Sequence, residues 1–252
     1  MTEIEFHFVD NDPSFNKNIP PFLLSSEERT AIDSHWNSVN LDGRFFNGPV
    51  LAATNINTSP ASPRLEVGLT DYAHYLYAAS NPGSSTPCKN VYCAALIVTK
   101  DNRLVIGQMA SRTAAPGKLQ LVGGNVELSP SGEIDARECC IREISEEVGD
   151  SFASAIEMNV PFCIKTGGPS QSVGLFYLAH ISLTATEAQN AFDLHQEATR
   201  QRGEEPELSQ LHFVALKQPE LDSVCVEHAG RMVDYLAPLL SNHLEQMARI
   251  PA

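Results

Sequence analysis

Several features that would point to particular protein classes are scarce or missing in this 252-residue chain. It carries 17 Lys and Arg against 31 Asp and Glu, a formal net charge of −14. Binding to phosphate backbones requires clustered cations, so this balance argues against a general nucleic-acid binder and against charge-driven membrane binding. No apolar run reaches the roughly 18 residues of a transmembrane helix, and the acidic start does not resemble a signal peptide. We therefore expect a cytoplasmic protein with no nucleic-acid or membrane partner.

Cysteine and histidine lack the spacing of a metal site or a disulfide framework. The six cysteines contain no C-x-x-C pair, and the adjacent Cys139 and Cys140 are poorly placed to bridge each other. The eight histidines are scattered without zinc-site spacing. The sequence favours buried, reduced thiols, as in cytosolic proteins.

A segment rich in Pro, Gly and Ser, residues 80–90, is typical of a linker. We predict an N-terminal accessory module over 1–88 and a larger domain over 89–252. In the module the expected helices are 26–38, with Ser25 at its start, and 70–79, capped by Thr70, and the expected strands are 44–53 and 64–68. In the larger domain the expected strands are 91–98, 103–107, 118–122, 160–165, 172–183 and 210–216, and the expected helices are 136–148, 184–197 and 226–247. This irregular order favours a mixed β-sheet with helices on both faces, accompanied by a small α+β module.

Carboxylates are concentrated at residues 142–149. In a helix with 100° per residue, Glu143, Glu146 and Glu147 fall within one arc of about 100°. The neighbouring arc holds residues that would face the core: Ala136, Cys140, Ile141, Ile144 and Val148. Like charges at these spacings repel, and a divalent cation bound by oxygen ligands, Mg²⁺ or Mn²⁺, would remove that cost. From these residues alone, a metal site and a solvated acidic face ending at Gly149 are equally good interpretations.

The residues before this helix favour the metal site. Gly123-Gly124-x-x-Glu127, followed by Arg142-Glu143-Ile144-x-Glu146-Glu147-x-Gly149, resembles the box of the Nudix hydrolase superfamily, G-x5-E-x7-R-E-U-x-E-E-x-G-U, with U a bulky aliphatic residue. Asp150 departs from the last position of that box. The stretch is also four residues longer than the family's box.

The position of these extra residues follows from the helix start. Asp135 and Glu138 have the spacing of a capping box, so the helix keeps its length and the insertion falls in the loop 128–134. Strict counting places the family's first box glutamate at Ile134. Glu133, one position away, and Glu138, four residues before Arg142, both remain open as substitutes.

The resemblance implies a Nudix-type α/β/α sandwich with a mixed sheet. It also implies hydrolysis of a nucleoside diphosphate linked to another moiety, with Mg²⁺ or Mn²⁺. By position, the metal ligands would be Glu143, Glu146, Glu147 and the carbonyl of Gly124, and Arg142 would orient the glutamates. Such cations draw charge from the diphosphate and activate a water, whose proton a carboxylate must accept. The expected catalytic residues are therefore Arg142, Glu143 and Glu147. The base is either Glu147 or a glutamate of the later region: Glu197, Glu204, Glu205 or Glu207.

Two N-terminal stretches bear on the substrate. Residues 42–49 and 68–72, together with the insertion in the box, are similar to the Nudix branch that splits UDP-glucose and UDP-galactose into UMP and sugar 1-phosphate. This resemblance implies that Arg44, Asn47 and Gly123 contact a nucleotide sugar. An ADP-ribose or NADH pyrophosphatase, and a Nudix-fold binding module without turnover, are the alternatives. A monomer and a homodimer both remain open.

Overall fold

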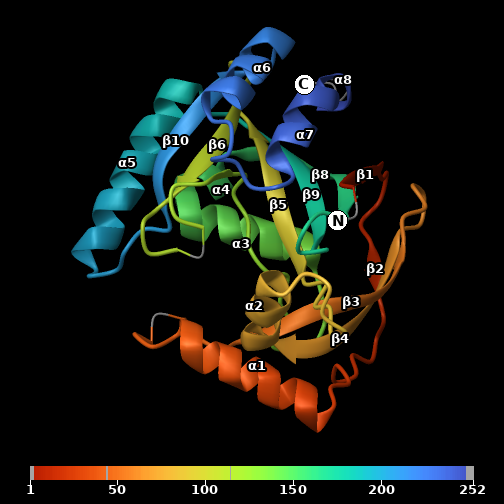
Figure 1. Cartoon of the computed structure of the whole chain (residues 1–252). Coiled ribbons are helices and arrows are strands. Elements are labelled where there is room, and N and C mark those ends of the chain that lie inside the picture. Colours follow the sequence, from red (N-terminus) through yellow and green to blue (C-terminus); the bar gives the residue numbers. More distant parts are fainter. Residues whose placement is uncertain (1–2, 44, 114, 248–252) are drawn as a thin grey trace. The chain divides into compact units, whose positions relative to one another are not determined.

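The structure, a computed structural model, describes residues 3–43, 45–113 and 115–247 (Figure 1). Two compact units make up the chain: unit 1 comprises residues 1–93, 125–136 and 163–175, and unit 2 comprises residues 94–124, 137–162 and 176–252. Unit 1 contains segments from both sides of residue 88, whereas all of unit 2 follows that residue. The boundary at that residue stays a prediction.

Unit 1 contains a three-stranded sheet with two helices. Its elements are β1 (Glu5–Phe8), β2 (Ser14–Phe15), α1 (Ser26–Val39), β3 (Pro49–Asn57), β4 (Arg64–Asp71) and α2 (Tyr72–Ser80). In the sheet β2-β4-β3, β2 runs parallel and β3 antiparallel to β4. Helix α1 begins after Ser25, as predicted, and its start is a capping box in which Ser25 and Glu28 exchange hydrogen bonds between side chains and backbone N–H groups. A buried cluster joins α2 to β3: Val50, Ala52, Ala78 and Cys88, covered by Phe22, Tyr72 and Tyr75.

The predicted cap of α2 is wrong by one residue. Thr70 belongs to β4, where it pairs with Val50, and its hydroxyl contacts the His74 ring nitrogen Nδ1 at 2.9 Å. Asp71 caps the helix instead, because its carboxylate accepts the His74 N–H at 2.9 Å. The strand continues farther than predicted, and the helix begins only where its ladder ends.

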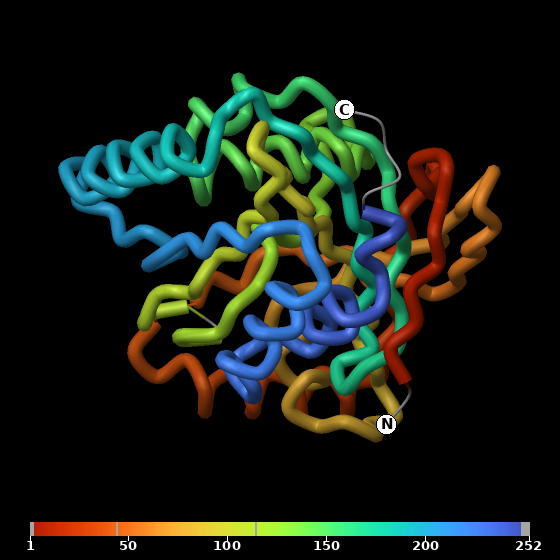
Figure 2. The backbone as a smooth tube through the Cα atoms, turned by 90° about the horizontal axis from the view of Figure 1, so that it is seen from above, coloured from red at the N-terminus to blue at the C-terminus, as the bar shows by residue number. Residues whose placement is uncertain are grey.

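The other elements, in chain order, are β5 (Val91–Val98), β6 (Arg103–Met109), β7 (Leu119–Gln120), α3 (Ala136–Val148), α4 (Asp150–Ser154), β8 (Ile156–Thr166), β9 (Val173–Ile181), α5 (Ala185–Gln201), β10 (Leu208–Ala215), α6 (Gln218–Glu227), α7 (Leu236–Asn242) and α8 (Leu244–Met247). The larger sheet has the order β1-β8-β9-β5-β6-β10, with β7 paired to β6. Within unit 2, α3 and α5 lie on one side of β6 and β10, and α6 and α7 lie on the other (Figure 2). The predicted mixed α/β fold is confirmed.

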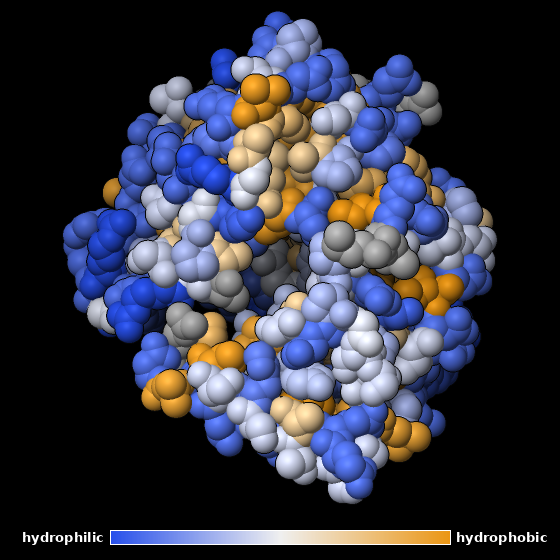
Figure 3. Space-filling model, in the orientation of Figure 1, coloured by the Kyte–Doolittle hydropathy of each residue, from blue (hydrophilic) through white to orange (hydrophobic). Residues whose placement is uncertain are grey.

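Helix α5 shows how burial positions these elements. It begins after Thr184 in a capping box and buries one stripe of residues: Ala188, Phe192, Gln196 and Thr199. Hydrophilic residues cover most of its outer face (Figure 3), where Leu194 is an exposed exception. Across the chain, all six cysteines are free and five are buried, as predicted. None of the helices within the described residues is long and apolar enough to span a membrane.

The predicted closing helix over 226–247 is wrong. Helix α6 ends at Glu227, and Gly230 adopts a left-handed backbone with φ of 77°. The chain then runs beside β7, where the N–H of Leu119 donates to the carbonyl of Arg231 at 2.7 Å. The apolar pattern over 226–247 has a helical period, and it does not reveal that residues near 231 pair with β7 before α7 begins.

Candidate active site

Helix α3 carries the clustered glutamates and has the bounds predicted from the sequence, Ala136–Val148. It starts directly after Asp135, as the proposed capping box requires. Four of the five predicted core residues are buried, and Ile141 is only half-buried, with Cys139 buried in its place. The acidic arc is not uniform either: Glu146 is exposed, Glu143 is half-buried, and Glu147 is only 4% exposed.

The Gly123-Gly124 turn lies against two of these glutamates. The N–H of Gly123 donates to Oε2 of Glu147 at 3.0 Å. A Cβ atom added to Gly124 would lie 2.5 Å from Cδ of Glu143, closer than real Cβ atoms approach other atoms. Glycine at position 124 therefore allows the Glu143 carboxylate to rest on the backbone of the turn. The structure thus places the Gly123-Gly124 turn against Glu143 and Glu147, although the loop between them is four residues longer than in the family's box.

That loop is closed by its own hydrogen bonds. Residues 128–134 contain no helix or strand, and the N–H of Ser129 donates to the carbonyl of Glu133 at 2.8 Å. The Ser129 hydroxyl accepts the N–H of Glu133 at 3.1 Å. Glu133 and Glu138 are both exposed, so the choice between them as the first box glutamate stays open.

Arg142 lies between the other two acidic side chains. Its guanidinium is 3.9 Å from Glu143 and 3.7 Å from Glu146. At these distances the interactions are electrostatic and lack the geometry of a bidentate hydrogen-bonded pair. Arg142 thus partly offsets the repulsion within the acidic arc. Its role in orienting the glutamates stays a prediction.

Two residues that the sequence did not single out hold this region in place. His195 of α5 donates from Nε2 to the Glu146 carbonyl at 3.0 Å, and its ring lies 3.0 Å from where a Cβ on Gly149 would be. With φ of 104°, position 149 favours glycine on both counts. Tyr235 is buried, and its hydroxyl accepts the N–H of Leu121 at 3.1 Å. Both come from distant segments, so no local pattern could have identified them.

Burial, together with the carboxylates of α3, raises the pKa values of two neighbouring side chains. Burial is the main cause that raises the pKa of Tyr235, and the charges of Asp234 and Glu147 raise it further. Burial likewise raises the pKa of Glu207, and repulsion from Glu146 adds to the effect. The site is therefore an acidic helix face against a glycine turn.

Residues 89–232, more than half of the chain, match the NUDIX domain family. The chain belongs to this family. The match begins at residue 89, within the predicted linker, and includes the turn and α3.

Comparison with other proteins adds little about substrate. No curated protein matches the chain. A solved protein from Deinococcus radiodurans is 16% identical, with a TM-score of 0.47, and the match covers 77% of this chain and 97% of that one. The MutT protein from Methanosarcina mazei Go1 is 13% identical, with a TM-score of 0.39 and coverages of 64% and 95%.

A third solved structure is a bifunctional NMN adenylyltransferase/ADP ribose pyrophosphatase from Francisella tularensis, complexed with AMP and Mn ion. It is 14% identical, with a TM-score of 0.40. The match covers 65% of this chain but only 43% of the Francisella chain. At these identities and TM-scores, none of the three informs the substrate of the present Nudix protein.

The side chains at the site limit how a metal ion could be held. Within the described residues, no three His, Cys, Asp or Glu side chains lie together in a group that could hold a metal ion. Mg²⁺, however, usually keeps several waters and takes only one or two protein carboxylates, together with substrate phosphates. The carboxylates beside the Gly124 backbone are oxygen donors of the right chemistry. The residues therefore fit Mg²⁺ or Mn²⁺ only where water or substrate oxygens complete the ligand set.

Four later glutamates were candidates for the catalytic base. Three of them have polar partners: Glu197 with Gln201, Glu204 with Arg202, and Glu205 with Arg112. Among the described residues, the carboxylate of Glu207 has no hydrogen-bond or ion-pair partner. It is also the one of the four whose pKa responds to Glu146. The structure thus distinguishes Glu207 from its neighbours.

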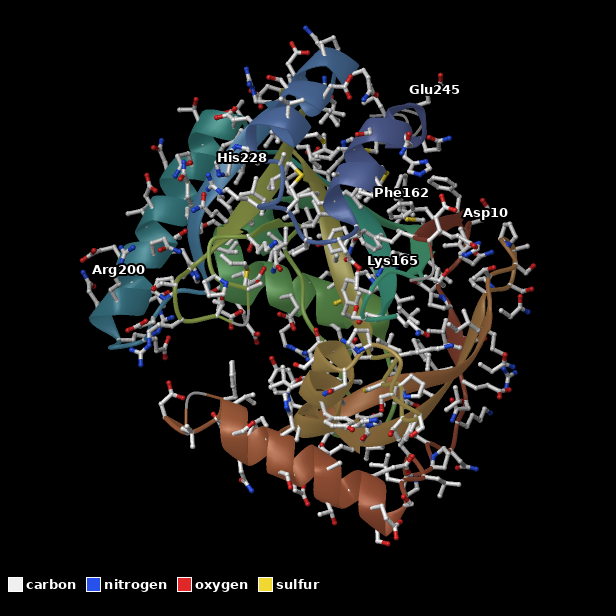
Figure 4. The ribbon with its side chains drawn as sticks, in the orientation of Figure 1. Asp10, Phe162, Lys165, Arg200, His228 and Glu245 are labelled. Carbon is white, nitrogen blue, oxygen red and sulfur yellow. The ribbon has the colours of Figure 1, made fainter. Side chains whose placement is uncertain are left out.

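A cavity of about 500 Å³ lies beside the same loop. Its lining includes Glu204, Glu205 and Arg200. Figure 4 labels Arg200, which lies toward the C-terminal end of α5.

Of the predicted substrate contacts, Arg44 lies outside the described residues. Asn47 accepts the N–H of Ala73 at 2.8 Å through its side-chain oxygen, so it has a structural role in unit 1. The contacts of Arg44, Asn47 and Gly123 with substrate stay predictions.

Proposed function

We propose that this Nudix protein hydrolyses a nucleoside diphosphate linked to another moiety, and that its substrate is UDP-glucose or UDP-galactose. The products would be UMP and a sugar 1-phosphate. One observation supports the catalytic part above all others: the glycine turn contacts both Glu143 and Glu147 although the box has four extra residues. The substrate choice rests on the N-terminal resemblance.

In this proposal Glu143, Glu146, Glu147 and the carbonyl of Gly124 hold Mg²⁺ or Mn²⁺. When bound, the metal withdraws charge from the diphosphate oxygens and lowers the pKa of a water. Arg142 keeps the carboxylates oriented, since it lies within 4 Å of two of them. The buried position of Glu147 restricts its rotamers, which favours a fixed ligand geometry.

We assign the general base to Glu207, with Glu147 as the competing candidate. A base must have a carboxylate available to accept the proton of the attacking water. The absence of a side-chain partner for Glu207 within the described residues and its proximity to Glu146 favour it. The adjacent cavity of about 500 Å³ is large enough for part of a nucleotide sugar.

The decisive experiment is turnover of a substrate panel with and without Mg²⁺. UDP-glucose, UDP-galactose, ADP-ribose and NADH would be incubated with the full chain, and nucleoside monophosphate release measured by chromatography. We expect metal-dependent UMP release from the UDP-sugars. Preferential cleavage of ADP-ribose or NADH would replace the substrate assignment, and no turnover of any compound would favour a binding module.

A matched pair of variants tests the site. Glu147→Gln should lower kcat by about 10²-fold or more, as expected for loss of a metal ligand. Glu220→Gln removes the same charge from an exposed position on α6 and should leave kcat unchanged. A folded Glu147→Gln protein with near-normal kcat would contradict the ligand assignment.

We further propose that the protein acts in the cytoplasm, as a monomer or homodimer.

A further inference from the structure

Two segments of unit 2 direct nitrogen atoms at a single oxygen atom carried by a third. Oε1 of Gln108, on β6, lies 3.4 Å from Nε2 of His212, on β10. The same oxygen lies 3.5 Å from Nη2 of Arg231, in the segment after α6. Both distances are long for hydrogen bonds of these types. Two donors thus converge on an acceptor that neither of them binds tightly.

Further nitrogen-bearing side chains surround this point. The ring of His228 packs edge-on against His212, with centroids 5.2 Å apart. Figure 4 labels His228, which is 8% exposed and whose buried Nδ1 has no hydrogen-bond partner. Lys118, next to this group, binds the carbonyl of Gly230 through Nζ at 2.9 Å. Such a concentration is unexpected in a chain whose net charge is −14.

Little acidic charge opposes these side chains. Glu227 lies 3.9 Å from Nε2 of His228, but its side chain is 71% exposed. Within the described part of the chain, Arg231 has no carboxylate partner. The pKa of His212 is lowered mainly by burial, and the charges of His228 and Arg231 lower it further, whereas Glu227 raises it. An anion placed among these groups would pair with Arg231 and favour the protonated form of His212.

We propose that Gln108, His212, His228 and Arg231, here named the histidine–arginine cluster, form a binding site for a phosphate group. The ligand is inorganic phosphate or a phosphate monoester. In the bound state the Gln108 side chain turns, a phosphate oxygen takes the position of its Oε1 and accepts from both donors, and the Gln108 amide N–H donates to the phosphate. Such charge-assisted bonds are roughly twice as strong as neutral ones, and the planar guanidinium suits phosphate geometry. Arg231 is exposed and His212 half-buried, so the anion has access from solvent.

A transition metal is a poorer fit to the same side chains. Two imidazoles are present, but no group of three candidate ligands exists among the described residues. The fixed positive charge of Arg231, which does not lose its proton in proteins, would also repel a cation. The arrangement therefore favours an anion.

The test is a titration of the labelled full chain with inorganic phosphate at constant ionic strength and without divalent metal. Side-chain NMR signals of His212 and His228 should shift and saturate. Arg231→Gln should weaken the affinity about tenfold, the loss expected for one charge-assisted hydrogen bond. Arg103→Gln removes the same charge from another part of β6 and serves as the control. Signals that do not shift, or equal weakening by both variants, would overturn the proposal.

A second variant guards against misfolding. Gln108→Glu places a carboxylate at the convergence point with almost no change in shape. It should abolish phosphate binding and raise Tm, because Arg231 and His212 then have an internal anion. Retained phosphate affinity in this variant would also overturn the site. UMP and glucose 1-phosphate form the other arms of the titration: tighter binding than inorganic phosphate identifies a monoester as the ligand. These measurements involve no turnover, so they stand or fall separately from the proposed hydrolysis.

Discussion

Replacing Gly124 by alanine should separate the activity of the protein from its stability. The new Cβ would lie 2.5 Å from Cδ of Glu143, whereas ordinary contacts begin at 3.4 Å, so the carboxylate must retreat by about 0.9 Å. A misplacement of about 1 Å in catalytic machinery costs roughly 10²-fold in rate, equivalent to about 2.7 kcal/mol in the barrier. We therefore expect kcat to fall about 10²-fold.

The stability of the same variant should change little. Gly124 does not have a positive φ, so its backbone conformation is open to alanine. The displaced atoms belong to the end of a flexible side chain, and the Gly→Ala change itself favours folding by about 0.4–1 kcal/mol through the unfolded state. Thermal unfolding followed by circular dichroism should give a Tm within a few degrees of the parent protein.

A double-mutant cycle gives the strictest check of this reasoning. If alanine at 124 acts by moving the Glu143 carboxylate, adding it to Glu143→Gln should lower kcat little beyond the Glu143→Gln value. If instead the two separate losses multiply, the assumed route through Glu143 is wrong. Gly68→Ala, whose Cβ would meet its nearest atom at 3.4 Å, controls for general effects of replacing a glycine.

Three further predictions follow from buried and partnerless groups. Burial lowers the pKa of His74 below its ordinary 6.5, so its contribution to stability is complete above that pH and is lost as pH falls toward the folded-state pKa; His74→Gln should flatten the fall in unfolding free energy between pH 7 and 5. Tyr235→Phe should lower the unfolding free energy in urea by about 1–3 kcal/mol, because it leaves the Leu121 N–H without its acceptor, and an unchanged midpoint would contradict this. Glu207→Gln should lower kcat by about 10²-fold or more and Glu197→Gln should not, and equal rates would remove Glu207 as the base.

Local signals in the sequence were sufficient for much of the fold. The bounds of α3 follow from its capping residues and apolar period, and the Ser25 box fixes the start of α1. Strand β1 was missed, because its partner is β8 and Glu5 pairs with Thr166, far along the chain. A four-residue strand has too short a pattern to be identified without its neighbour.

The residues of the candidate site also fall into two groups: those expected from the sequence and those that only the structure reveals. The resemblance to the Nudix box implied that Gly124 and Glu143 share one site, and the structure places the Glu143 carboxylate against the Gly124 backbone. His195 and Tyr235 act through a backbone carbonyl and a backbone N–H of other segments. Such contacts depend on tertiary packing and leave no trace in residue spacing. The sequence can therefore indicate which carboxylates lie at the glycine turn, but not the residues from distant segments that pack around them.

The two proposed sites of unit 2 have opposite electrostatic character, and this makes them separable. At the glycine turn, carboxylates outnumber Arg142, and Glu146 and Glu147 raise the pKa values of nearby acids. An anionic diphosphate would be repelled there over the screening length of about 8 Å at physiological salt, so its binding requires cations from outside the chain. The histidine–arginine cluster has a fixed cation of its own, Arg231. Removing divalent metal with a chelator should therefore abolish hydrolysis and leave phosphate affinity at the cluster intact; loss of both together would mean that the two regions do not act independently.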